Sequence, residues 1–260
     1  MYSALIKQLI AILIAEMPEY RAQAAQVEET QEAQRELLRA LMNVRPPRPL
    51  SEEFLRIQDE LLSAERKVRG VVDVMTLPAV PSNARIVLWQ GDITRLNADA
   101  IVNAANSALL GCFIPCHRCI DNAIHSAAGL QLRAACAALM ERQGHPEATG
   151  TAKLTAGYNL PARRVLHTVG PIVHGTLTEE HRHLLASCYR SCLALAAKHG
   201  LKSVAFCCIS TGEFHFPNDA AAEIAVREVR DFLTVPSSIE RVVFNVFKGN
   251  DRCIYERLLL

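Results

Sequence analysis

Two patterns of apolar residues divide the chain. In the first part, apolar side chains recur at helical spacing at Leu5, Leu9, Ile12 and Leu13. Residues 19–42 contain mainly Ala, Gln, Glu, Arg and Leu, which favours helix. The run Arg45-Pro-Pro-Arg-Pro49 ends this pattern because consecutive prolines exclude helix, and Ser51 with the glutamates after it is typical of a new helix start. We therefore expect residues 1–80 to form a helical extension.

In the second part, short β-branched runs alternate with helical stretches. The predicted strands are residues 86–89, 100–102, 152–155, 165–169, 204–209 and 242–247. The predicted helices are residues 120–142, 177–199 and 219–233, with a last turn or two after residue 250. This alternation predicts an α/β sandwich with a mostly parallel sheet over residues 81–260. In such folds, ligand sites lie at the carboxyl ends of the strands.

Composition and charge narrow the possible functions. Of the 260 residues, 50% are hydrophobic and 21% are charged, a balance typical of folded proteins. The net charge of +1 argues against coating a nucleic acid, and the apolar run at residues 9–15 is far shorter than the roughly 20 residues that span a bilayer. Nine cysteines favour a reducing compartment over a disulfide framework. We expect a cytoplasmic protein that contacts neither membrane nor nucleic acid.

Three polar segments follow predicted strands. They are residues 91–94, the stretch from Asn103 to residue 129, and residues 210–217. Asp92 is suited to accept a hydrogen bond from the amino group of a base, or to cap a helix near Thr94. The amides of Asn103 and Asn106 are suited to bind a hydroxyl-rich ligand or to satisfy the loop backbone. These positions indicate a candidate ligand site at the carboxyl edge of the sheet.

The segment Gly111-Cys-Phe-Ile-Pro-Cys-His-Arg-Cys119 holds three thiols and an imidazole, a density typical of a metal site. Cys112, His117 and Cys119 suit Zn²⁺ and leave a fourth tetrahedral position for water or substrate, as a catalytic site requires. A closed site that also includes Cys116 would be structural. Buried or redox-sensitive thiols are the alternatives without a metal. The thiols expected to fill the core are Cys136, Cys188, Cys192, Cys207 and Cys208.

Several segments together resemble the ordered motifs of the macrodomain family. They are Gly91-Asp-Ile-Thr94, Ala100-Ile-Val-Asn-Ala-Ala-Asn106, Ile124-His-Ser-Ala-Ala-Gly129, His167-Thr-Val-Gly-Pro171 and Ile209-Ser-Thr-Gly212. The resemblance covers about residues 85–260, and the insertion at residues 111–122 resembles the zinc-containing branch, whose members also carry a helical N-terminal extension. It implies a three-layer α/β/α sandwich with a mixed, mostly parallel sheet, and an ADP-ribose cleft at the carboxyl edge of the strands.

The resemblance also implies roles for individual residues. Asp92, with Ile93 beside it, should bind the adenine amino group, and Phe247 is expected either to stack on adenine or to lie in the core. Asn106 and Asn103 should hold the distal ribose at the catalytic centre. The backbone amides expected to wrap the pyrophosphate are those of Ser210, Thr211, Gly212, Glu213 and Phe214.

Three histidines fall within or beside these motifs. Many macrodomains have glycine where this chain has His215, and glycine permits a positive φ beside the ligand. A histidine there would crowd the pyrophosphate, gate the cleft or be a normal feature of the zinc branch. His125 and His167 are expected to serve packing.

The zinc branch implies a catalytic arrangement. The ion would be held by Cys112, His117 and Cys119, with Cys116 at a variable position. Asp121 aligns with the acidic position that hydrolytic macrodomains use near the scissile bond, and it would orient or deprotonate a water. Zinc nearby should keep this carboxylate ionised. Two mechanisms stay open, attack by zinc-bound hydroxide and anchoring of the ribose hydroxyls by zinc.

These implications predict a zinc-dependent protein-ADP-ribose hydrolase that acts on Asp or Glu ester linkages. The alternatives are a reader that binds ADP-ribose without cleaving it and an O-acetyl-ADP-ribose deacetylase. The branch further implies two partners, an ADP-ribosylated substrate protein such as a lipoyl-carrier protein and a microbial sirtuin-type ADP-ribosyltransferase. The N-terminal helices are interpreted either as a flank of the main domain or as a partner-binding arm.

Overall fold

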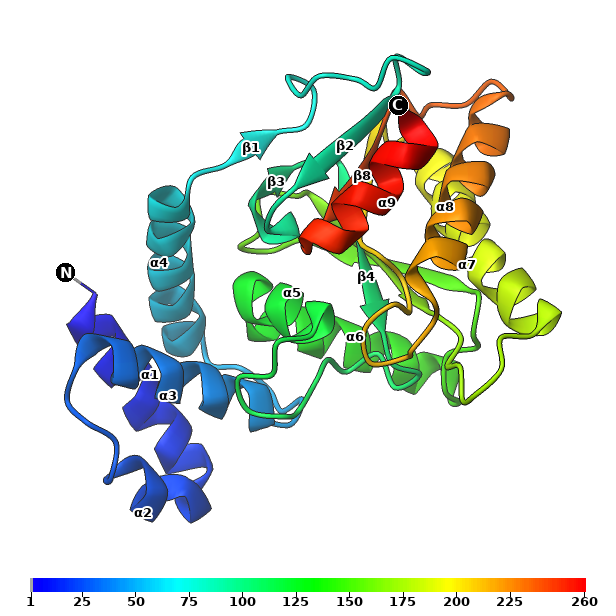
Figure 1. Cartoon of the computed structure of the whole chain (residues 1–260). Helices are drawn as coiled ribbons and strands as arrows, with labels where there is room; N and C mark the ends of the chain where they lie inside the picture. Colours follow the sequence, from blue (N-terminus) through cyan, green and yellow to red (C-terminus); the bar gives the residue numbers. More distant parts are fainter. Residues whose placement is uncertain (1) are drawn as a thin grey trace.

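The computed structural model describes residues 2–260, in which an N-terminal helical region precedes a sheet flanked by helices (Figure 1). The N-terminal helical region consists of α1 (Ser3–Glu16), η1 (Pro18–Tyr20), α2 (Arg21–Ala24), α3 (Gln31–Val44) and α4 (Glu52–Arg69). The Ser51 side chain accepts a hydrogen bond from the amide of Phe54 and caps α4, as predicted. Thr30 caps α3 in the same way.

The N-terminal helices bury their apolar faces against one another. Their buried side chains are Ile6, Leu9, Leu13, Leu38, Leu41, Phe54, Ile57 and Leu61. Each such burial contributes about 1.5–3 kcal/mol. Leu130, from the second part of the chain, lies in the same cluster, so the region is packed on its neighbour. The division into domains at residue 80 stays a prediction.

The central sheet has six strands in the order β2-β8-β7-β4-β6-β5. Their bounds are β2 (Ile86–Gln90), β4 (Ala100–Ala105), β5 (Ala152–Ala156), β6 (Arg164–Val169), β7 (Ser203–Phe206) and β8 (Arg241–Val246). All neighbours pair parallel except β5, which runs antiparallel to β6 at the edge. A separate parallel pair joins β1 (Val72–Asp73) to β3 (Leu96–Asn97). The predicted mixed, mostly parallel sheet is confirmed.

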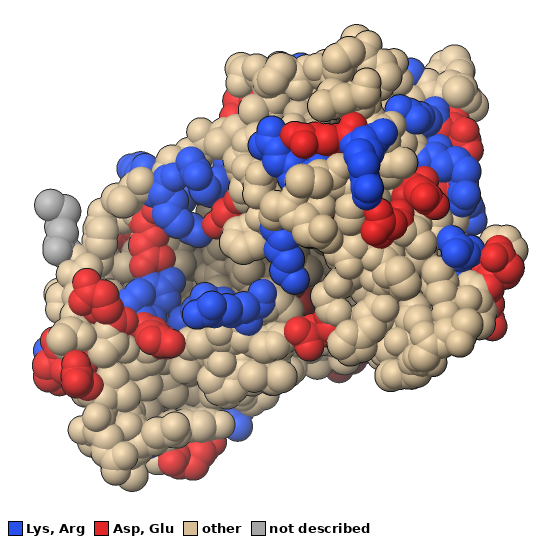
Figure 2. All heavy atoms as spheres, viewed as in Figure 1, with Lys and Arg blue, Asp and Glu red and all other residues tan. Residues whose placement is uncertain are grey.

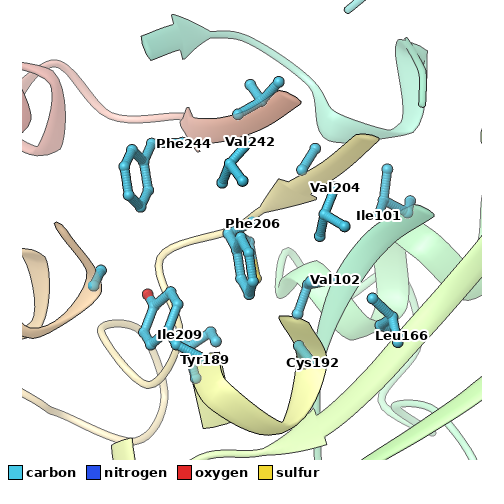
Figure 3. Close-up of a cluster of buried hydrophobic side chains, with 14 of the residues drawn as sticks. Ile101, Val102, Leu166, Tyr189, Cys192, Val204, Phe206, Ile209, Val242 and Phe244 are labelled. Carbon is cyan, nitrogen blue, oxygen red and sulfur yellow. The ribbon is translucent and has the colours of Figure 1, made fainter. Parts of the chain in front are cut away.

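Helices lie on both faces of this sheet. They are α5 (Ile120–Ala128), α6 (Leu130–Gln143), α7 (Glu179–Lys198), α8 (Asn218–Leu233) and α9 (Gly249–Leu259). Tyr189 of α7 packs on Phe206 of β7 with ring centroids 4.9 Å apart, in a core that also contains Cys192 (Figure 3). The predicted α/β/α sandwich is therefore confirmed. Among residues 2–260, no helix is both long and apolar enough to cross a membrane.

Three predicted element boundaries were wrong. The helix expected at residues 120–142 is two helices, because Gly129 between them has φ +94°. This backbone conformation favours glycine, because residues with a Cβ rarely adopt it. The strand expected at residues 204–209 ends at Phe206, which leaves Cys207 and Cys208 outside it. The strand expected at residues 100–102 continues to Ala105, so Asn103 lies in the sheet and not in a loop.

Candidate functional site

Asp92 lies where β2 ends at the carboxyl edge of the sheet. Its Oδ1 accepts hydrogen bonds from the backbone amide of Thr94 at 2.9 Å and from the Thr94 hydroxyl at 2.7 Å, so the capping role is confirmed. The second oxygen, Oδ2, lies 3.8 Å from Nη1 of Arg69, and the side chain is 39% exposed. One carboxylate oxygen is therefore open to a ligand. Ile93, the next residue, is buried.

Phe247 follows β8, the strand beside β2. Asn245 near the end of β8 donates a 2.9 Å hydrogen bond from Nδ2 to the carbonyl of Gly91, which ties the two strand ends together. The Phe247 side chain is 73% exposed. The core alternative for Phe247 was therefore wrong, because its ring is exposed just after the end of β8.

The loop at residues 210–217 follows β7 and adopts a strained, compact form. Ser210 and His215 have φ values of +65° and +55°, the left-handed region that favours glycine. The side chain of His215 is exposed, and its backbone takes the conformation that glycine would supply. The ends of the loop are joined by a 3.0 Å hydrogen bond from the amide of Phe216 to the carbonyl of Ser210.

Two features of this 210–217 loop suit an anion. Within residues 2–260, no protein acceptor binds the backbone amides of Gly212, Glu213 and Phe214. Successive free amides in a turn form an anion-binding concavity. Gly170, at the end of β6, lies so close that a Cβ on it would be 2.0 Å from Oγ of Ser210. Glycine at 170 therefore lets the loop approach the sheet edge.

Asn103 and Asp121 form the buried centre of the site. Asn103 Nδ2 donates to Oδ1 of Asp121 at 2.7 Å and lies 3.2 Å from Nδ1 of His167. Nε2 of His167 lies 2.9 Å from the hydroxyl of Thr155. This pattern assigns the proton of a neutral His167 to Nε2, because Nδ1 must accept from the amide. The carbonyl oxygen of Asn103 is buried and has no partner among residues 2–260. It is an acceptor available to a hydroxyl group.

Asp121 has a perturbed acidity. Burial raises its pKa to about 6, although the hydrogen bond from Asn103 and the charge of Arg133 act in the opposite direction. Asn106 Nδ2 lies 3.5 Å from the other carboxylate oxygen and donates to the carbonyl of Gly111 at 3.2 Å. Asn106 thus connects the acid to the start of the cysteine-containing segment. The expectation that Asp121 stays ionised depended on nearby zinc, so it stays a prediction.

His125 lies one helical turn after Asp121 on α5. Its Nε2 is 3.5 Å from Asp121 Oδ1, but burial lowers the pKa of His125 well below its usual value, so the imidazole is neutral and this contact is no ion pair. The donor atoms of His125, Cys136 and His167 lie within 4.8 Å of one another. His167 is already bonded to Asn103 and Thr155, and burial raises the pKa of Cys136 to about 12. We assign this group to packing.

Cys112, His117 and Cys119 converge on one point. Their donor atoms lie within 4.8 Å of one another, with Cys112 Sγ 3.6 Å from Nδ1 of His117. Donors about 2.0–2.3 Å from a tetrahedral zinc lie roughly 3.3–3.8 Å apart. The separation between Cys112 and His117 falls in this range. Burial raises the pKa of Cys119 to about 12, and a bound cation would displace its proton. We call residues 112–119 the ligand loop.

Cys116 is held outside this group. Its thiol lies 3.4 Å from the backbone carbonyl of Glu36 on α3, and its amide donates to Oδ1 of Asn43 at 3.0 Å. Its φ of +52° turns the ligand loop at this point. The geometry favours the open three-ligand set over the closed set with Cys116.

The N-terminal helical region reaches the site at two points, which the sequence analysis missed. Arg69 of α4 lies beside Asp92, and Arg39 of α3 donates to the carbonyl of His117. The surface is hollowed between this region and the part of the chain that contains the six-stranded sheet. Lys and Arg side chains gather there (Figure 2). The sequence holds no local signal for these contacts, because only the structure shows that Asn43 is buried on the packed face of α3.

Comparison with known proteins agrees with this geometry. The family model described as "Macro domain" matches residues 102–225. A Treponema medium protein named "Protein-ADP-ribose hydrolase" is 51% identical over 96% of each chain. A Fusarium oxysporum f. sp. cubense protein named "Probable bifunctional ADP-ribose hydrolase/ADP-ribosyltransferase" is 44% identical over 86% of this chain and 40% of its own length.

A solved structure extends the comparison to the fold. The Trypanosoma brucei macrodomain in complex with ADP-ribose has a TM-score of 0.67 and 34% sequence identity, and the match covers 85% of this chain and 95% of that chain. The fold therefore has a counterpart among solved structures. The chain belongs to the macro domain family.

Proposed function

We propose that this protein is a zinc-dependent protein-ADP-ribose hydrolase that acts on ester linkages to Asp or Glu. The observation that carries the proposal is the contact between Asn103 and Asp121 beside the ligand loop, with a buried acceptor of Asn103 left free. A free acceptor that suits a hydroxyl, an acid of raised pKa and the donor set of Cys112, His117 and Cys119 together support this proposal. The names of the relatives support the reaction class.

The site residues match the parts of ADP-ribose in order. The open oxygen of Asp92 and the exposed ring of Phe247 suit the adenine, and the free amides of the 210–217 loop suit the pyrophosphate. The unpartnered carbonyl oxygen of Asn103 suits a hydroxyl of the distal ribose. The ligand would thus run along the carboxyl edge from β2 to β4.

Asp121 is placed for proton transfer. Without a metal, burial raises its pKa to about 6, and a carboxylate with a pKa in this range is a stronger base than an exposed one. Asn103 fixes Oδ1, and Asn106 lies near the second oxygen. The role we assign to Asp121 is to orient the attacking water and take its proton, while Asn103 holds the sugar.

Zn²⁺ would be held by Cys112, His117 and Cys119, which fit it by donor chemistry and spacing. When bound, such an ion supplies Lewis acidity at an open coordination position. Glu213 Oε1, in the 210–217 loop, lies 3.7 Å from Nε2 of His117. This contact brings the anion-binding segment next to the donor set, as a site for the sugar end of a nucleotide requires.

Two alternative functions use the same cleft. A reader would bind ADP-ribose without releasing it, but a reader has no need of a buried acid beside the ribose site. An O-acetyl-ADP-ribose deacetylase differs from the proposed enzyme only in its leaving group. Comparison of the hydrolysis rates on the modified protein and on O-acetyl-ADP-ribose distinguishes the deacetylase from the proposed enzyme.

The substrate protein and the partner enzyme are further parts of the proposal. A lipoyl-carrier protein modified by a sirtuin-type ADP-ribosyltransferase in the cytoplasm is the substrate that we propose. The Fusarium oxysporum relative supports a link to a transferase, because its name joins a hydrolase and an ADP-ribosyltransferase in one chain.

The test measures metal content and the release of ADP-ribose from an Asp- or Glu-modified protein. The wild type should bind one zinc per chain and release ADP-ribose, and Cys119→Ala should lose both properties. Cys253→Ala is the matched control, because this exposed cysteine lies outside the site on α9. Full turnover by zinc-free Cys119→Ala protein would refute the role of the metal, and complex formation without release would indicate a reader.

A further inference from the structure

One face of α3 is turned toward the ligand loop. Glu36, Arg39 and Asn43 are spaced by three and four residues, so they share this face. Each makes a contact with the ligand loop or with the start of α5. No other part of the N-terminal helical region makes a hydrogen bond to residues 112–119 within the described chain.

Arg39 contacts the backbone of His117 and the side chain of Asn122. Its guanidinium donates to Oδ1 of Asn122 at 2.7 and 3.2 Å and to the backbone carbonyl of His117 at 3.1 Å. Asn122 is fully buried, and its backbone amide donates to Sγ of Cys119 at 3.4 Å. Its side chain also donates to the carbonyl of Ile114 at 3.1 Å. Arg39 therefore connects the backbone of His117 to Asn122, whose amide donates to the thiol of Cys119.

Asn43 supplies a second anchor one turn later. Its Oδ1 accepts from the amide of Cys116 at 3.0 Å, and its Nδ2 donates to the hydroxyl of Ser126 on α5 at 3.2 Å. Phe113 and Ile114 in the same segment are exposed, so the ligand loop has little apolar packing of its own. Outside α3, the same segment contacts the guanidinium of Arg133, which lies 4.3 Å from the Phe113 ring centroid.

The end of α3 is itself hydrogen-bonded to α6, in the part of the chain that contains the sheet. Arg133 of α6, which is buried, donates from Nη1 to the backbone carbonyls of Met42 and Asn43 and from Nε to the carbonyl of Leu110 at 2.7 Å. A single guanidinium thus joins the last turn of α3 to the chain just before the ligand loop. The last turn of α3 is therefore held against residues 110–133 by buried hydrogen bonds.

We infer that Arg39 and Asn43 are positioning residues for the donor set, so the N-terminal helical region is a structural part of the reaction centre. The part of this inference that concerns zinc rests on the proposed function. The part that concerns the order of the ligand loop rests on the contacts of α3. Hydrogen-bonding partners outside the ligand set typically change metal affinity by about 10- to 100-fold when they are removed.

Full-length variants separate this role from general stability. Arg39→Ala removes both contacts, Arg39→Lys keeps the charge without the planar donor fork, and Asn43→Ala removes the second anchor. Arg35→Ala is the matched control, because Arg35 lies one turn earlier on α3 and pairs with Glu65 of α4. The readouts are Zn²⁺ affinity by competition with a chromogenic chelator, and amide hydrogen exchange of residues 112–119 in metal-free protein.

Arg39→Ala should weaken Zn²⁺ binding by about 10- to 100-fold and speed exchange across the ligand loop. Arg39→Lys should restore part of both properties, and Arg35→Ala should match the wild type. Wild-type affinity and exchange in Arg39→Ala would overturn the inference. If Arg39→Ala fails to fold, the same two measurements on Arg39→Lys and Asn43→Ala test the inference. If the wild type binds no zinc, the proposed metal chemistry fails, and the exchange rates still decide whether α3 orders the loop.

Discussion

The side-chain amide of Asn103 lies 2.7 Å from Oδ1 of Asp121 and 3.2 Å from Nδ1 of His167. Both protons of the amide are therefore used, which turns its carbonyl oxygen into the free member of a buried network. The side chain of Asn103 thus connects the neutral His167 in the sheet to the carboxylate of Asp121 at the start of α5. It explains why a polar residue can be tolerated in the middle of β4.

Asn103→Ala should weaken ADP-ribose binding and slow hydrolysis together. The substitution removes both the free acceptor and the donor to Asp121, and loss of that donor should raise the pKa of Asp121 further. Removal of one hydrogen bond to a charged group lowers the free energy of unfolding by about 1.5–3 kcal/mol. Calorimetric binding and release assays measure the two effects. Unchanged affinity would remove Asn103 from the ribose site.

Asp121→Asn should retain binding while losing turnover. The amide has nearly the same shape as the carboxylate, but it cannot take a proton from water. General-base catalysis contributes about 10²- to 10⁴-fold, so release of ADP-ribose should slow by a factor in this range. The measurement pairs single-turnover release with the dissociation constant for ADP-ribose. An Asp121→Asn enzyme of wild-type rate would exclude a proton-transfer role.

Gly170→Ala should disrupt the 210–217 loop. An added Cβ would lie 2.0 Å from Oγ of Ser210 and 2.9 Å from Cγ2 of Ile209, so the residues at the start of the loop must shift. We expect at least a clear loss of ADP-ribose affinity, because the free amides of this loop would be displaced. Gly249→Ala is the control, since a Cβ there meets open space at the start of α9. Equal affinity in both variants would contradict the proposed pyrophosphate site.

Acid should destabilise the protein through His167. Burial lowers its pKa from 6.5 to about 4, so between these values the unfolded chain binds more protons than the folded one. The stability that this group contributes is complete above pH 6.5 and is lost as the pH falls toward 4. The slope is about 1.4 kcal/mol per pH unit.

Denaturant unfolding across this pH range tests the effect, with His167→Gln as the comparison. Glutamine keeps a neutral hydrogen-bonding group and has no proton to gain, so the free energy of unfolding of the variant should depend less on pH. His125 is buried and shifted in the same direction, so some acid sensitivity should persist. The same pH dependence in the variant and the wild type would show that His167 is not buried as a neutral base.

Local patterns in the sequence predicted the strands and the donor set. The β-branched runs predict β2 and β6 because a buried parallel strand needs apolar side chains on both faces. Cys112, His117 and Cys119 lie close along the chain, so their convergence needs only one loop. Asn103 was placed in a loop because a polar residue is unexpected in a central strand. Its burial depends on partners more than 15 residues away, Asp121 and His167.

The contribution of α3 was not visible in the sequence for the same reason. Arg39 and Asn43 lie about 80 residues before their partners in the ligand loop and α5, and no local pattern joins segments at that distance. The break at Gly129 was also missed, because helical periodicity continues across it and the positive φ of this residue shows only in the structure.

The most direct test of the account is the anomalous scattering of crystals grown with ADP-ribose, measured on both sides of the zinc absorption edge. The account predicts one peak about 2.0–2.3 Å from Cys112 Sγ, a His117 ring nitrogen and Cys119 Sγ, beside the distal ribose of the nucleotide. A bound nucleotide with no peak at these three side chains, or with its ribose far from Asn103 and Asp121, would contradict it.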